Sequence, residues 1–137
     1  MGAVQLKWVA STLMTGVDSL GNSIVIGRWP EADPQWNGLK ASDLLLLAAA
    51  SCSTYDVVTI LKKQRQTLVS LEVRCTGDQM PDPPYTFTKI HLHYTVRGEV
   101  SVDRLTKAIQ LSEEKYCSVI TSLKPTVEFT HSYEILV

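Results

Sequence analysis

A single long apolar stretch constrains the fold of this chain more than any other feature. Ser42 is predicted to cap a helix that runs to about Gln66, with Asp43 in its positive first turn. Residues 44–50 are apolar on every side, which is typical of a helix buried all round, and beyond Asp56 the pattern becomes amphipathic. One small chain has difficulty burying such a helix. We therefore expect a homodimer in which the central helices pack across an interface.

Alternating apolar and polar residues predict strands before and after this helix. The predicted strands are residues 4–11, 13–18, 23–29, 68–76, 87–97 and 129–137. A second helix is expected from the Ser101 cap, interrupted at residues 112–115 and stopped by Pro125. Strands grouped around two main helices indicate an α+β fold with an antiparallel sheet of about six strands, in a single domain covering residues 1–137.

Charge and composition exclude several classes of function. The 13 basic and 14 acidic residues are dispersed and give a net charge of −1, so neither nucleic acid nor an anionic membrane surface is an expected partner. The longest wholly apolar run, Leu44–Ala50, is too short to span a membrane. Residues 1–5 lack the features of a secretory signal, and an odd count of three cysteines argues against a secreted disulfide framework. A cytoplasmic location is the expectation.

Two of the cysteines are candidates for thiol chemistry. Cys52 lies in the middle of the apolar helix, and Cys117 follows the break in the second helix, 65 residues later (117 − 52). If the fold brings them together, they offer a nucleophilic thiolate with a resolving partner. A helix starting after the break would place Cys117 near a positive terminus, beside Lys115. A cysteine considered alone is more often a small buried hydrophobic residue, and we retain that interpretation for Cys75.

Three further polar residues have weaker claims to a functional role. Asp56 is four residues after Cys52 on the same helical face, where it is either an acceptor near the site, a solvent-facing residue or a cap for another element. His91 and His93 share one face of a strand. Two such ligands without a third nearby favour a solvated polar face over a metal site.

Two longer motifs resemble those of a known family. Each contains a cysteine with distinctive neighbours. The first motif is Leu39–Cys52, continued by Tyr55–Val58 and Ile60–Lys63. The second motif is Leu111–Val119. They resemble the central-helix and second-cysteine motifs of the OsmC/Ohr superfamily, most closely its YhfA-type branch. Strand order and length agree too, so the resemblance extends over essentially the whole chain.

The resemblance implies an OsmC-like, intertwined homodimer that acts as a thiol peroxidase on organic hydroperoxides. Cys52 matches the peroxidatic cysteine and Cys117 the resolving cysteine, which would condense with a Cys52 sulfenic acid to a disulfide. A dithiol reductant, such as a lipoylated protein, would restore both thiols. No cofactor and no metal are expected.

The same resemblance suggests residues that surround the thiolate. Arg28 matches the arginine that holds it, although an ordinary exposed strand-end arginine is equally compatible with the sequence. Asp43 lies where the family has an acid, but it precedes Cys52 by nine residues, on the opposite side of a continuous helix. A role in the helix dipole is therefore favoured for Asp43. Trp29, Trp36 and Tyr55 are candidates to line an apolar substrate pocket, with core packing as the alternative.

Two other functions remain open at this point. One is a catalytically weak OsmC-like dimer that binds a small apolar or electrophilic ligand. The other is a structural or regulatory dimer whose thiols respond to oxidants without turnover.

Overall fold

The computed structural model of the protein describes residues 2–27 and 38–137. These residues form an α+β fold with three helices and two sheets of three strands each. The chain divides into two compact units, residues 1–45 and 46–137, which we describe separately. The expectation of a single domain over residues 1–137 stays a prediction.

The amino-terminal unit contains an antiparallel sheet in the order β1-β2-β3. Its strands are β1 (Gln5–Ala10), β2 (Leu13–Val17) and β3 (Ser23–Ile26). All three coincide with predicted strands, and the predicted end of the third, beyond Gly27, lies outside the described residues. The alternation in β1 predicts a half-buried strand, yet all six of its residues are exposed, including Leu6 and Trp8.

The carboxyl-terminal unit contains the helices and a second sheet. Its elements are α1 (Ala41–Lys63, whose first turn belongs to the amino-terminal unit), β4 (Thr67–Gln79), β5 (Phe87–Glu99), α2 (Val102–Leu111), η1 (Ser112–Tyr116), α3 (Ser118–Leu123) and β6 (Glu128–Leu136). The predicted break in the second helix is confirmed, because a π-helical turn, η1, separates α2 from α3. The helix also ends before Pro125, as predicted.

The expected single antiparallel sheet is not found among the described residues. Their six strands form two separate sheets, and in the order β4-β5-β6 the last pair is parallel. The antiparallel assignment is therefore wrong for β6. Residues 100–127 between β5 and β6 contain α2, η1 and α3, so the chain returns to the beginning of β5 before β6 starts. Such a crossover connection gives parallel pairing.

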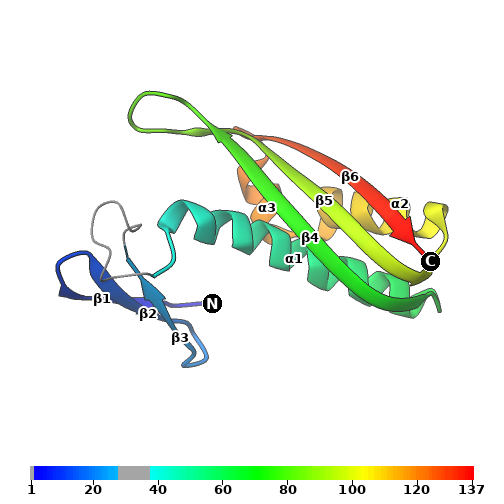
Figure 1. Ribbon diagram of the computed structural model, residues 1–137, viewed down its shortest axis with the longest axis horizontal. Coiled ribbons are helices and arrows are strands. Elements are labelled where there is room, and N and C mark those ends of the chain that lie inside the picture. Colours follow the sequence, from blue (N-terminus) through cyan, green and yellow to red (C-terminus); the bar gives the residue numbers. More distant parts are fainter. Residues whose placement is uncertain (1, 28–37) are drawn as a thin grey trace. The chain divides into compact units, whose positions relative to one another are not determined.

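The core lies between the β4–β6 sheet and the helical segments on one of its faces (Figure 1). The strict alternation in β5 buries one row of its side chains, as predicted. The fully buried core residues of β5, α1 and α2 are Ile90, Leu92, Tyr94 and Val96, then Ala49, Val57 and Leu61, then Leu105, Ala108 and Ile109. Burying each large apolar side chain among them contributes roughly 1.5–3 kcal/mol.

Within residues 2–27 and 38–137, α1 is covered only in part. By length and composition alone the helix is long and apolar enough to cross a membrane, and 28% of its most apolar window is buried. Leu47 is 53% exposed and Tyr55 is 73% exposed. The described residues therefore do not bury this helix on every side, as expected for one small chain, and its burial across a dimer interface stays a prediction.

Gly98 provides a test of the β4–β5 pairing. It has a φ of +129°, and a Cβ at this position would collide with the Thr67 carbonyl oxygen of β4. We expect Gly98→Ala to lower the free energy of unfolding by about 2 kcal/mol or more, because the substitution adds both backbone strain and a clash. Urea denaturation followed by circular dichroism measures this change. Gly2→Ala, which meets no atom within 4 Å, is the matched control and should leave stability unchanged. Equal stabilities of the two variants would contradict the described pairing.

Candidate functional site

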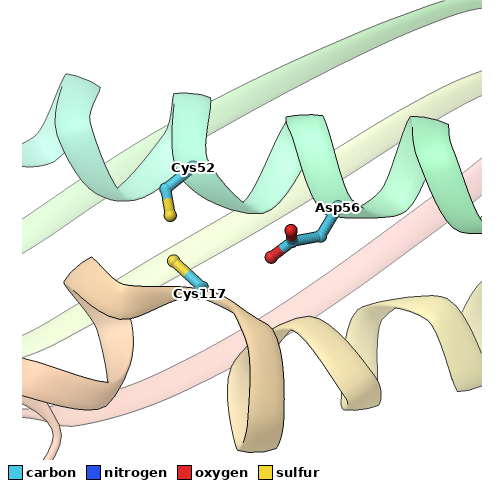
Figure 2. Close-up of side chains that lie close together, drawn as sticks. All are labelled: Cys52, Asp56 and Cys117. Atoms are coloured by element: carbon cyan, nitrogen blue, oxygen red, sulfur yellow. The ribbon is translucent and has the colours of Figure 1, made fainter.

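The central helix α1 presents two functional side chains on one face. Cys52 and Asp56 are separated by four residues, which places them one helical turn apart on the same side. Figure 2 shows both side chains extending from α1 toward Cys117. Both are half-buried. The residues one turn before Cys52 on its own helix, Ala48 and Ala49, have small side chains.

Cys117 occupies the junction between η1 and α3. Its backbone is extended, with φ −79° and ψ 107°, and its N–H donates to the Ser112 carbonyl oxygen at 2.8 Å. As the N-cap of α3, its Sγ accepts a hydrogen bond from the Ile120 N–H at 3.4 Å. A helix does start after the break, so the condition under which the sequence placed Cys117 near a positive helix terminus is met. The π-helical turn and the extended cap together direct this thiol toward α1 (Figure 2).

Three functional atoms converge between α1 and this junction. The sulfur atoms of Cys52 and Cys117 and a carboxylate oxygen of Asp56 all lie within 4.8 Å of one another. Both cysteines are free thiols. Two cysteines 65 residues apart (117 − 52) in the sequence thus become neighbours in the fold.

The two thiols differ in accessibility and in protonation. Cys117 is fully buried, whereas Cys52 is partly exposed. Burial raises the pKa of the Cys117 thiol to about 12, and its hydrogen bond with Cys52 acts in the same direction. The Ile120 N–H lowers this pKa, but burial outweighs it. Cys117 therefore keeps its proton at neutral pH, despite its place at a helix start.

A chain of buried hydroxyl groups leads from the sheet to Asp56. The Tyr94 hydroxyl on β5 lies 2.6 Å from Ser53 Oγ, which lies 3.3 Å from Ser112 Oγ. Ser112 Oγ lies 2.8 Å from Asp56 Oδ2. Tyr94, Ser53 and Ser112 are all fully buried. Burial raises the pKa of Tyr94, so its hydroxyl stays protonated.

Ser112 is the donor that reaches the carboxylate. Its hydroxyl donates to Asp56 Oδ2 at 2.8 Å, and it is also placed to donate to Ser53 Oγ at the longer distance of 3.3 Å. In the contact between Ser53 and Tyr94 either hydroxyl can donate. These contacts link the Asp56 carboxylate to the sheet and hold it beside the two thiols.

A cavity of about 380 Å³ adjoins Asp56. Its walls come from α1, the loop after it, the end of α2 and η1, and the lining residues are Tyr55, Asp56, Thr59, Ile60, Lys63, Gln64, Leu111 and Tyr116. Tyr55 and Tyr116 are both more than half exposed. The cavity is thus mainly apolar and aromatic, with one basic and one acidic side chain.

The other residues nominated from the sequence fall in three places. Arg28, Trp29 and Trp36 lie outside the described residues. Asp43 is exposed in the first turn of α1, the placement that its dipole role requires. Tyr55 forms part of the cavity wall.

Cys75 and the paired histidines lie apart from this cluster. Cys75 is half-buried on β4, and burial raises the pKa of its thiol to about 11. The His91 ring nitrogens lie within hydrogen-bond distance of Thr130 and Ser132 on β6. His93 likewise contacts Ser132. The polar face predicted for the two histidines is thus a hydrogen-bonded sheet face.

Sequence reasoning missed the three hydroxyl residues of the site. Ser53 and Ser112 are short polar residues at positions that are buried only in the folded chain, and Tyr94 reads as an ordinary core residue. Ser112 alone carried a signal, since it opens the segment that interrupts the apolar stripe of the second helix.

Comparison with known proteins places this chain among relatives of the same fold. The Escherichia coli strain K12 protein YhfA is 37% identical over 134 residues, which are 96% of each chain. A crystal structure of a hypothetical protein from Aquifex aeolicus superimposes with a TM-score of 0.88 at 31% identity and covers 99% of this chain and 96% of its own. The organic hydroperoxide resistance protein OsmC of Legionella pneumophila has the same fold, with a TM-score of 0.72, 13% identity and 96% coverage of both chains.

The family assignment rests on sequence as well as on fold. The profile of the family described as OsmC-like protein matches residues 33–132, which contain both cysteines of the site and Asp56. The resemblance seen in the two cysteine motifs is thereby confirmed. This chain belongs to the OsmC-like family.

Proposed function

We propose that this protein is a cysteine-based thiol peroxidase that reduces organic hydroperoxides. The observation that carries the proposal is the proximity of a partly exposed thiol, Cys52, to a fully buried one, Cys117. The partly exposed Cys52 can meet a peroxide, whereas the fully buried Cys117 can reach only its neighbour. A hydroperoxide resistance protein of the same fold supports this choice of substrate class.

The first step is attack of the Cys52 thiolate on the peroxide O–O bond. The sulfur takes the terminal oxygen and becomes a sulfenic acid, while the alkoxide takes a proton and leaves as an alcohol. Because Cys117 retains its proton, its S–H can donate a hydrogen bond to the Cys52 thiolate and stabilise it. Arg28 is the cation that the family resemblance assigns to the same thiolate.

The second step joins the two sulfurs. The Cys117 sulfur attacks the Cys52 sulfenic acid, its proton leaves with the hydroxide as water, and a disulfide remains. A bridging disulfide requires the sulfurs to approach to about 2.05 Å. The extended backbone at Cys117, between two short helical turns, is where this movement would occur. A dithiol such as a lipoylated protein then transfers two electrons and restores both thiols.

The apolar part of the substrate would occupy the cavity beside Asp56. Tyr55, Leu111 and Tyr116 offer it aromatic and aliphatic surface. Trp29 and Trp36 remain proposed contributors to the pocket. Three free cysteines fit a reducing compartment, and we propose the cytoplasm.

A homodimer is part of the proposal. Each of the two units leaves large apolar side chains exposed: Leu47 (53%) and Tyr55 (73%) on α1, and Leu6 (59%) and Trp8 (68%) on β1. Exposed apolar side chains of this size are typical of protein–protein contacts. A second copy would bury them, in keeping with the sequence-based expectation of central helices that pack across an interface.

Treatment of the reduced protein with one equivalent of cumene hydroperoxide should produce a Cys52–Cys117 disulfide. Mass spectrometry of the intact chain should show the loss of two hydrogens, and peptide mapping should identify the joined residues. Cys52→Ser should lower the rate of peroxide consumption at least about 100-fold, because the nucleophile is gone. Cys117→Ser should instead accumulate a sulfenic acid that dimedone traps.

Cys75→Ser is the matched control for these variants. Cys75 lies apart from the cluster, so this variant should consume peroxide at the normal rate and still form the disulfide. Normal turnover by Cys52→Ser would refute the proposed mechanism. A disulfide that involves Cys75 would refute the assignment of the resolving residue.

Cys75 also gives a prediction about pH. Its thiol is neutral below its pKa of about 11, and only the thiolate reacts with iodoacetamide. Alkylation of Cys75 should therefore rise about tenfold per pH unit from about pH 8 toward 11. Peptide mass spectrometry at a series of pH values follows this reaction. A rate that already levels off at about pH 9 would show that the thiol is not shifted upward.

The dimer is tested by size-exclusion chromatography with light scattering, where the mass should be twice the 15.2 kDa of one chain. Leu47→Glu should raise the dimer dissociation constant at least about tenfold, because a charge would enter an apolar interface. Val102→Glu, which changes an exposed valine on α2, is the control and should remain dimeric. A monomeric wild-type protein would contradict this part of the proposal.

A further inference from the structure

We propose that the reduced protein binds a divalent metal ion of the zinc type through Cys52, Asp56 and Cys117. Within residues 2–27 and 38–137, these three form the group of cysteine and acidic residues whose donor atoms converge, all within 4.8 Å of one another. The residues come from two elements, α1 and the η1–α3 junction, and no short spacing motif in the sequence marks them. The inference stands independently of peroxide turnover.

The donor set matches the preferences of Zn²⁺. Two sulfurs and one carboxylate oxygen are all common zinc ligands, at about 2.3 Å for sulfur and about 2.0–2.2 Å for oxygen. In a tetrahedral site these bond lengths put neighbouring donors about 3.5–3.8 Å apart. The observed limit of 4.8 Å therefore requires only small side-chain rotations. Three protein ligands also leave one position open, as in zinc sites that bind water or substrate.

The helical backbone places two of the three proposed ligands side by side. Cys52 and Asp56 are separated by four residues on α1, so their side chains lie on one face, one turn apart. Cys117 approaches that face from the extended junction opposite (Figure 2). Because the third ligand lies on a different element, a bound ion would tie α1 to the start of α3.

Asp56 is held by a hydrogen bond of the kind that supports metal ligands. Ser112 donates to its Oδ2 at 2.8 Å, and a carboxylate has two oxygens and several lone pairs with which to bind an ion as well. Hydrogen bonds of this kind to a ligating carboxylate orient it and strengthen binding. Among the described residues Asp56 has no ion-pair partner, so no described basic group competes for its charge. Asp56 also borders the 380 Å³ cavity, which has room for a water or a small ligand at the open position.

Metal binding and disulfide formation would exclude each other. Coordination turns each thiol into a thiolate and releases its proton to solvent, so the oxidation state of the sulfur does not change. A disulfide instead removes two electrons from the same two sulfurs and leaves neither as an anionic ligand. The ion would therefore protect the pair from oxidation, and oxidation would release the ion.

Cobalt(II) is the probe for this site, because it reports its own ligands. Titration of the reduced full-length protein under anaerobic conditions should give one equivalent of bound Co²⁺ per chain. Sulfur-to-cobalt charge-transfer absorption should appear in the near ultraviolet, with visible bands of tetrahedral intensity, and Zn²⁺ should abolish both. X-ray absorption of the zinc-bound wild type should show two sulfurs at about 2.3 Å and oxygen at about 2.0 Å.

Three variants and one control locate the ligands. Asp56→Asn, Cys52→Ser and Cys117→Ser should each weaken binding at least about tenfold, and each cysteine variant should lose about half of the charge-transfer intensity. Cys75→Ser should bind as the wild type does. Circular dichroism confirms that each variant is folded, and the X-ray absorption measurement needs no variant.

Each result bears on one proposal only. Absence of the charge-transfer band, its loss in Cys75→Ser, or unchanged affinity in Asp56→Asn would overturn the three-ligand site. A protein that consumes hydroperoxide without binding cobalt would leave the peroxidase intact and refute the metal site. A protein that binds cobalt and consumes no hydroperoxide would do the reverse.

Discussion

The packing of α1 against the buried row of β5 fixes the rest of the carboxyl-terminal unit. Apolar burial and hydrogen bonding both act there, and they contribute different amounts of free energy. Burial of each large apolar side chain contributes roughly 1.5–3 kcal/mol, whereas a hydrogen bond contributes about 1 kcal/mol net. Val57 and Leu61 are fully buried in the same core cluster as the β5 row, and this apolar packing therefore holds the helix in place. The contact of Ser53 with Tyr94 then selects its rotation, because both polar groups are fully buried and only one orientation pairs them.

The rotation of α1 about its own axis decides which of its side chains reach the site. With Ser53 turned to the sheet, Cys52 and Asp56 turn toward the η1–α3 junction (Figure 2). Ser112, the first residue of η1, then bonds both to Ser53 and to Asp56. The same residue accepts the Cys117 N–H through its carbonyl oxygen. One buried serine thus connects the helix, the carboxylate and the second thiol, which explains why groups from distant parts of the sequence meet with so little freedom.

Much of this architecture was predictable, and the exceptions have physical causes. The long helix was predicted correctly from its Ser42 cap and its long apolar stretch, and β5 from its strict alternation of apolar and polar residues. The parallel pairing of β6 was not, because strand direction depends on the path of the intervening chain and not on the strand's own residues. The two cysteines were found through their motif. The contact between Asp56 and Ser112 joins residues 56 positions apart, and no local pattern in a single sequence encodes it. Arg28, Trp29 and Trp36, which the sequence suggested as neighbours of the thiolate and of the substrate, lie outside the described residues.

The π-helical turn has a consequence for how such proteins diverge. Its hydrogen bond from the Cys117 N–H to the Ser112 carbonyl oxygen spans five residues instead of the four of an α-helix, so the turn accommodates one additional amino acid. Loss of a single codon within Ser112–Tyr116 would restore α-helical spacing and would rotate the helical positions that follow it by about 100° around the axis. A descendant could then keep Cys117 in its alignment and still aim that sulfur elsewhere. Whether a relative keeps the site would then depend on the number of residues in this turn, and conservation of the cysteine alone would not show whether the site is intact.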